Sequence, residues 1–156
     1  MRILISEYSV MAQEFLLYHG TKKNFKNFDL RFFNSGSGDG GWLGYGIYLT
    51  NDYEYAESYG DILECSVFLK NPYILKDYSY STSPNKLAEE LNVNSAKGIS
   101  ATLMKAGYDS VLLTYSDDFK EEKFIELCVF NPSDVKILKR YKQGDDSDEV
   151  MKKRGY

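Results

Sequence analysis

The chain has 156 residues, the size of one ordinary domain, and its 43% hydrophobic and 27% charged residues exclude a wholly disordered protein. A formal net charge of −4 argues against nucleic acid as the main partner, because a phosphate backbone demands a basic face. We therefore expect a single domain over residues 1–142 with its core over 15–138, followed by a flexible charged tail over 143–156.

Cysteines, apolar runs and possible metal ligands set further limits. Cys65 and Cys128 lie in apolar runs, where buried free thiols are the default, so we expect a reducing compartment, the cytoplasm. No stretch approaches the roughly 18 apolar residues of a membrane span, and residues 1–10 are too short and polar for a secretory signal. One histidine and two distant cysteines cannot assemble a zinc site. We expect a monomer with no metal and no membrane partner.

The first predicted element is a buried strand over residues 15–21, an apolar run that carries His19 near its end and stops at Gly20. The sequence then becomes polar and rich in glycine, so residues 34–41 are expected to form a loop. Long loops without secondary structure are uncommon in compact domains unless they carry function. This loop is therefore a candidate binding loop or lid.

The next elements are a strand and a short helix. Gly46 would let the backbone approach a ligand closely, and a strand begins after it over residues 47–50. Asp52, with the residue before it, is typical of a helix N-cap, which predicts a helix over residues 53–59 that ends at Gly60.

The second half of the chain reads as strand, helices and strands. The strand predicted over residues 62–69 stops before Pro72. One or two amphipathic helices follow within residues 85–106, ending at Gly107. Their expected buried positions are Leu87, Leu91, Ala101, Leu103 and Met104. The last predicted strands are residues 110–115, 124–130 and 135–138, with a charged turn at 116–123.

Aromatic residues are unusually frequent, with fourteen tyrosines and nine phenylalanines. Tyrosine offers a flat face and a polar edge to a ligand, although many of these residues also suit half-buried strand positions. Several common catalytic signatures are missing: the sequence has no hydrolytic triad and no phosphate-binding P-loop. The glycines of residues 36–41 resemble a dinucleotide fingerprint only superficially, because they do not join a strand to a helix.

Four pieces in a fixed order carry the functional signal. They are Tyr-His-Gly-Thr at 18–21, Gly-Ile-Tyr-Leu-Thr at 46–50, Tyr59 eleven residues after Tyr48, and Glu-Leu-Cys-Val-Phe-Asn-Pro at 126–132. The set resembles ADP-ribosyltransferases of the His-Tyr-Glu class, which includes poly-ADP-ribose polymerases and diphtheria-type toxins. Residues 69–72, 106–111 and 129–136 look like the connecting signatures of the compact domains carried by phages and bacterial mobile elements. The resemblance covers roughly residues 15–138.

The resemblance implies a fold and a reaction. The fold is α+β, a split β-sandwich of two small antiparallel sheets around an NAD⁺ cleft, with flanking helices. The reaction is ADP-ribosylation, in which ADP-ribose passes from NAD⁺ to a macromolecular acceptor and nicotinamide is released. Nothing in the sequence supports chain elongation, so we expect transfer of a single unit, mono-ADP-ribosylation. NAD⁺ would be a co-substrate, and the protein would be a phage or bacterial effector that acts on a target in the host cytoplasm.

The resemblance also implies site residues. Glu126, His19 and Tyr48 would be catalytic, with Glu126 stabilising the positive charge that develops on the ribose as the glycosidic bond loosens. His19 would bind ribose hydroxyls, the backbone of Gly20 would hold the carboxamide, and Tyr48 and Tyr59 would sandwich the nicotinamide ring. The remaining candidate NAD⁺-binding residues are Thr21, Gly46 and Arg31, the last as a pyrophosphate contact. Each of these residues also has an ordinary structural interpretation as core packing, turn or surface charge.

Two positions depart from the pattern. Ala56 stands where relatives with a polymerase-like pocket have a serine that also holds the carboxamide, and Phe124 stands where arginine-modifying relatives have glutamate or glutamine. Arginine is therefore a less suitable acceptor, and a protein acceptor is favoured over nucleic acid by the net charge. Simple NAD⁺ hydrolysis stays open, as do a catalytically inactive NAD⁺ or ADP-ribose binding module and a protein-interaction module that acts as an inhibitor. A phosphotransferase that uses NAD⁺ would need a basic cluster around the pocket, which the sequence does not indicate.

Overall fold

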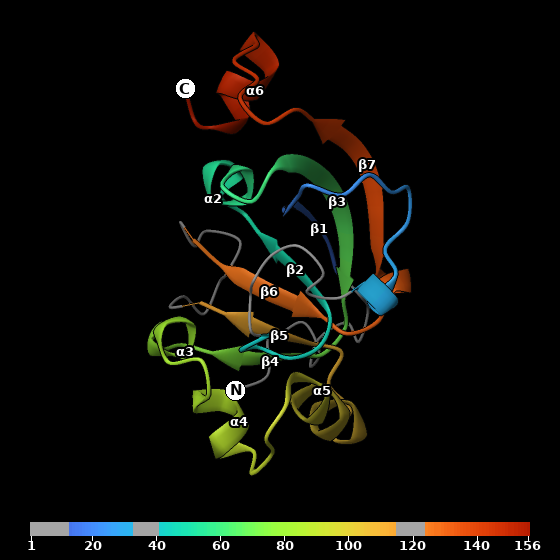
Figure 1. Ribbon diagram of the computed structural model, residues 1–156, viewed down its shortest axis with the longest axis vertical. Helices are drawn as coiled ribbons and strands as arrows, with labels where there is room; N and C mark the ends of the chain where they lie inside the picture. Colours follow the sequence, from blue (N-terminus) through green and yellow to red (C-terminus); the bar gives the residue numbers. More distant parts are fainter. Residues whose placement is uncertain (1–12, 33–40, 115–123) are drawn as a thin grey trace.

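A computed structural model describes residues 13–32, 41–114 and 124–156. Within these ranges the chain forms seven β-strands and five short α-helices (Figure 1). The strands are β1 (Gln13–Thr21), β2 (Ile47–Thr50), β3 (Asp61–Leu69), β4 (Pro72–Leu75), β5 (Ser110–Leu113), β6 (Glu126–Val129) and β7 (Val135–Tyr141). The α-helices are α2 (Tyr53–Glu57), α3 (Ser79–Thr82), α4 (Lys86–Glu90), α5 (Ala96–Lys105) and α6 (Asp148–Lys153), and the 3₁₀ turns are η1 (Leu30–Phe32) and η2 (Pro132–Asp134).

The seven strands join into one mixed sheet in the order β4-β5-β6-β2-β1-β3-β7. Only the β4–β5 pair is parallel among the described strands. The α+β class is thus confirmed, whereas the expected pair of small antiparallel sheets is not confirmed. The sheet nevertheless has a weak seam, because β1 pairs with β3 along nine residues but meets β2 only where Tyr18 opposes Thr50.

The central strands are buried on both faces. On β6, Leu127 and Val129 enter a core cluster shared with β1, β2, β3 and β7, whereas Cys128 enters a second cluster that packs under α4 and α5. Successive side chains of a strand point to opposite faces, so β6 serves both clusters. Every residue of β5 and β6 is therefore buried, including the polar residue that begins each strand.

The predicted helices at 85–106 are the two helices α4 and α5. Ser95 caps α5 by accepting a hydrogen bond from the backbone N–H of Gly98, and Gly107 follows the helix with a positive φ of 98°. Leu87 and Leu103 are buried and Leu91 is partly buried, as expected, but Ala101 and Met104 are exposed. The reason is the phase of α5, in which Ile99, Ser100 and Leu103 form the buried stripe.

The sequence did not predict β4. Its first residue, Pro72, lacks a backbone N–H, which is tolerated at the start of an edge strand. The strand pairs in parallel with β5 at the edge of the sheet, and α3, α4 and α5 lie at the same end of the molecule (Figure 1).

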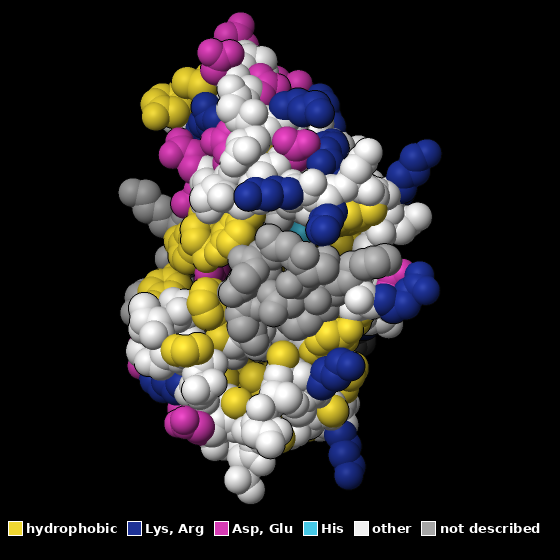
Figure 2. Space-filling view, in the orientation of Figure 1, with side chains coloured by type: hydrophobic (Ala, Val, Ile, Leu, Met, Phe, Trp, Pro, Cys, Tyr) yellow, Lys and Arg dark blue, Asp and Glu magenta, His cyan; other side chains and the backbone are white. Residues whose placement is uncertain are grey.

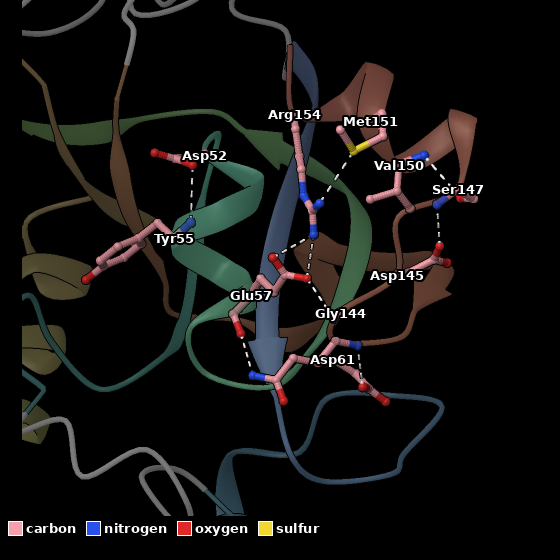
Figure 3. Close-up of polar contacts among 11 residues, drawn as sticks. Asp52, Tyr55, Glu57, Asp61, Gly144, Asp145, Ser147, Val150, Met151 and Arg154 are labelled. Atoms are coloured by element: carbon pink, nitrogen blue, oxygen red, sulfur yellow. Dashed lines mark hydrogen bonds and ion pairs between the residues drawn. The ribbon is translucent and has the colours of Figure 1, made fainter. Parts of the chain in front are cut away.

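The C-terminal segment differs from the predicted flexible tail, because residues 148–153 form α6, which packs beside α2 (Figures 1 and 3). Val150 is fully buried against Tyr53, Ala56, Ile62 and Tyr141. Arg154, one turn further along, binds Glu57 of α2 through both carboxylate oxygens at 2.8 Å. The mixed charges of the segment did not reveal that one apolar residue, Val150, and one half-buried cation, Arg154, share a helix face.

The surface around α6 carries interspersed acidic and basic side chains (Figure 2). No helix among the described residues is long and apolar enough to cross a membrane. Within the same ranges, no group of three or more histidine, cysteine, aspartate or glutamate side chains is arranged to hold a metal ion.

Candidate active site

His19 lies at the seam between β1 and β2. Its Nδ1 is 2.6 Å from the carbonyl oxygen of Tyr48. A carbonyl only accepts hydrogen bonds, so Nδ1 carries the proton and, in the neutral ring, Nε2 is left as an acceptor. Burial lowers the pKa of His19, and the hydrogen bond to Tyr48 opposes this shift only in part, so the neutral ring is favoured. Edge-on contact with Phe28, whose ring centroid is 4.9 Å away, fixes the imidazole further.

Tyr48 is anchored by its hydroxyl to the turn that precedes β2. The hydroxyl donates to the carbonyl of Gly44 at 2.8 Å and accepts from the backbone N–H of Leu43 at 2.9 Å. Gly46, at the start of this strand, is required by the approach of β6, because a Cβ there would lie 2.3 Å from the carbonyl oxygen of Val129. These contacts fix where the Tyr48 ring stands relative to β6.

Helix α2 lies directly against Gly20. A Cβ on Gly20 would be 1.8 Å from the carbonyl oxygen of Ala56 and 3.0 Å from the Cβ of Tyr59. Only glycine permits this approach, which brings Tyr59 next to the strand that carries His19. Asp52 begins the helix as predicted, accepting from the backbone N–H of Tyr55 at 3.1 Å.

Thr21, the next residue of β1, is nearly buried, and its hydroxyl accepts from the backbone N–H of Lys23 at 3.0 Å. Gly60 ends the α2 segment with a positive φ of 141°. A Cβ on Gly60 would lie 2.4 Å from the Thr21 carbonyl oxygen, so the chain after α2 passes close to the end of β1. The structure thus gives Gly20 and Thr21 clear structural roles.

Glu126 is a buried carboxylate, with only 5% of its surface exposed. The Tyr55 hydroxyl donates to its Oε1 at 2.8 Å, and the Tyr59 hydroxyl lies 3.2 Å from the Tyr55 hydroxyl. The rings of Tyr55 and Tyr59 pack edge to face with centroids 5.6 Å apart, and Phe124 contacts the Tyr55 ring at 5.1 Å. Hydrophobic side chains gather over this region of α2 and β6 in Figure 2. A negative charge thus sits beside partly exposed aromatic rings, an arrangement suited to a flat cation.

The structure brings most of the predicted site residues together. Thr50 pairs with Tyr18 of β1 and with Glu126 of β6, so the strands that carry His19, Tyr48 and Glu126 are direct neighbours. Tyr59, in the turn that follows α2, joins them through its contact with Tyr55. Sequence reasoning missed Tyr55, although its spacing of four residues from Tyr59 on a predicted helix indicates a shared face.

Two further sequence predictions stand apart from this cluster. Arg31 forms a bidentate pair with Asp29, with a shortest distance of 2.6 Å, and its side chain is 83% exposed. The pair holds the pKa of Asp29 below its usual range. The candidate lid at 34–41 lies outside the described residues except for Gly41.

Comparison with known protein families gives a match over most of the chain. The family described as ADP-ribosyltransferase in polyvalent proteins matches residues 13–143, which include all seven described strands and α2 but not α6. A search of curated proteins found no match.

Proposed function

Because the chain belongs to the family of ADP-ribosyltransferases in polyvalent proteins, we propose that it transfers one ADP-ribose unit from NAD⁺ to a macromolecular acceptor. The observation that carries this proposal is the buried Glu126 carboxylate, which accepts from the Tyr55 hydroxyl beside the rings of Tyr59 and Phe124. Removing a carboxylate from water is costly, and a site that must stabilise a developing cation gives a reason to keep one there.

In this proposal, the nicotinamide ring of NAD⁺ stacks on Tyr59 and Tyr48, and the backbone of Gly20 holds its carboxamide. The imidazole of His19 accepts a hydrogen bond from a ribose hydroxyl through Nε2, the nitrogen that the contact with Tyr48 leaves as an acceptor. Thr21 and Gly46 shape the walls of the site through their backbone positions. Arg31 contributes to pyrophosphate binding only if it exchanges part of its pairing with Asp29.

The chemical step breaks the bond between ribose C1′ and the nicotinamide nitrogen, and the bonding electron pair leaves with nicotinamide. Positive charge develops on the ribose, and Glu126 stabilises it. A nucleophile of the acceptor then forms a new bond to C1′ and releases its proton. Water in place of the acceptor gives NAD⁺ hydrolysis.

We further propose a protein acceptor other than arginine and an effector role in a host cytoplasm. Phe124 supports the first part, because it offers no polar group two residues before Glu126 to orient a guanidinium. The net charge of −4 and the interspersed surface charges favour protein over nucleic acid.

The test is nicotinamide release from NAD⁺ by the purified protein in a bacterial lysate, together with transfer of labelled ADP-ribose to lysate proteins. Glu126→Gln keeps the shape of the side chain and an acceptor for Tyr55, so we expect a folded protein that loses at least about a hundredfold in rate. Glu149→Gln, at an exposed position on α6, is the matched control and should remain active. Turnover in Glu126→Gln equal to that of the unchanged protein would refute the proposal, and NAD⁺ binding without turnover in either would indicate a binding module.

A further inference from the structure

The Tyr55 hydroxyl lies between the Glu126 carboxylate and the Tyr59 hydroxyl, and the proposed function gives Tyr55 no role of its own. It donates to Glu126 at 2.8 Å, and it lies 3.2 Å from the Tyr59 hydroxyl. An ionised carboxylate only accepts hydrogen bonds, and Tyr55 has one hydroxyl proton. That proton goes to Glu126, so Tyr59 must be the donor to Tyr55. The three groups therefore form a chain with a single direction, from Tyr59 through Tyr55 to Glu126.

The position of Tyr55 is fixed from several sides. Its ring contacts Phe124 on one side and Tyr59 on another, both edge to face. Its backbone N–H is bound by Asp52 at the start of α2. Figure 3 shows the Tyr55 side chain on the opposite side of α2 from the pair of Glu57 and Arg154. These contacts hold the Tyr55 ring in place, and the ring in turn fixes the position of its hydroxyl.

We propose that Tyr55 is a positioning residue, which fixes the Glu126 carboxylate relative to the Tyr59 ring. This inference rests on the proposed function, in which Tyr59 stacks on nicotinamide and Glu126 stabilises the ribose cation. The bond that breaks joins nicotinamide to the ribose, so the rate depends on how the stacking ring and the carboxylate are placed relative to one another. A misplacement of about 1 Å in such a site can cost about a hundredfold in rate.

A purely structural role for Tyr55 makes a different prediction. In that case its hydroxyl would only satisfy a buried carboxylate and stabilise the fold, and its removal would lower stability without a selective effect on the chemical step. Burial, followed by the hydrogen bonds to Tyr59 and Glu126, raises the pKa of Tyr55. The phenol therefore stays protonated and remains a donor over any pH at which the enzyme would be assayed.

The experiment measures kcat and KM for NAD⁺ by nicotinamide release in Tyr55→Phe, which keeps the ring and removes the hydroxyl. We expect kcat to fall about tenfold and KM to change less than about twofold, since the lost hydrogen bond acts on the transition state rather than on stacking. Tyr53→Phe is the matched control on the same helix. The Tyr53 hydroxyl is buried and has no hydrogen-bond partner among the described residues, so its removal should leave both constants unchanged.

A double-mutant cycle separates positioning from general loss of structure. If Tyr55 acts through Glu126, Tyr55→Phe has little further effect on the residual rate of Glu126→Gln. Tyr59→Phe provides a second variant should Tyr55→Phe melt below the assay temperature, and loss of the first donor in the chain should lower kcat by about two- to threefold.

An unchanged kcat in Tyr55→Phe, in an active and folded enzyme, would overturn the inference and leave the proposed function intact. An equal effect in the Glu126→Gln background would also overturn it, because the hydroxyl would then act elsewhere. An unchanged protein that releases no nicotinamide would refute the proposed function, and this role with it.

Discussion

Replacement of Arg154 by alanine removes the cation that ties α6 to the helix of the candidate site. The guanidinium donates to both oxygens of Glu57 at 2.8 Å, and the two side chains are only 15% and 18% exposed. Glu57 also accepts from the backbone N–H of Gly144 and, through its carbonyl, from the side chain of Gln143, each at 2.8 Å (Figure 3). Arg154 is therefore the cation in a small polar cluster built around one carboxylate.

The expected loss follows from this geometry. Removing one partner of a buried ion pair costs about 3–5 kcal/mol, because the other charge stays buried without compensation. Glu57 keeps its contact with Gly144 and some exposure to water, so we expect a loss of about 2–3 kcal/mol in the free energy of unfolding. For a chain of this size, that corresponds to a fall in Tm of about 5–10 °C.

Thermal and urea unfolding, followed by circular dichroism, measure this loss. Lys139→Ala is the matched control, because it breaks an exposed ion pair that reaches α6, with Glu149, in which the side chains are 49% and 54% exposed. We expect little change there. In the double variant Glu57→Gln with Arg154→Ala, neither charge of this pair remains, so the loss of stability should be smaller than the sum of the two single losses. An Arg154→Ala protein as stable as Lys139→Ala would refute the view that this pair anchors α6.

Two further predictions concern β1. Gly20→Ala places a methyl group 1.8 Å from the carbonyl oxygen of Ala56, so α2 must move; we expect a loss of about 2–3 kcal/mol in urea unfolding and loss of nicotinamide release. An active, stable Gly20→Ala protein would contradict the close packing of α2. The pKa of His19 is lowered in the folded protein from its ordinary value of 6.5. Below pH 6.5 the unfolded chain therefore binds a proton at His19 more readily than the folded protein does. The contribution of His19 is therefore complete above pH 6.5 and is lost as the pH falls towards the lowered pKa; the difference in Tm between the unchanged protein and His19→Gln should follow this course, and a difference that is independent of pH would contradict it.

The elements that sequence reasoning predicted well are those with local signals. Asp52 caps α2 as predicted, although the helix ends at Glu57 and not at residue 59, and the apolar runs around His19 and Cys65 define β1 and β3. The elements it missed depend on partners far away in the chain. β4 becomes a strand only beside β5, and the exposure of Met104 depends on which side of α5 faces the sheet.

For the candidate site, too, the sequence indicated some of the residues but not the long-range contacts that hold them. The spacing of Tyr48, Tyr59 and Glu126 identified residues that lie on adjoining elements, but it gave no information on what holds the carboxylate. Tyr55 is separated from Glu126 by 71 positions, so their contact depends on how α2 packs over the seam. The same distance effect concealed the pairing of Glu57 with Arg154, 97 positions apart.

The seam between β1 and β2 explains why side chains matter so much in this site. One residue pair joins these strands, and α2 has only five residues, too few for a stable isolated helix. The relative placement of His19, Tyr59 and Glu126 therefore depends on contacts other than sheet pairing: the imidazole on the Tyr48 carbonyl, Gly20 against Ala56, and Tyr55 on the carboxylate. Each of these single contacts is therefore a point where one substitution should change the geometry of the site.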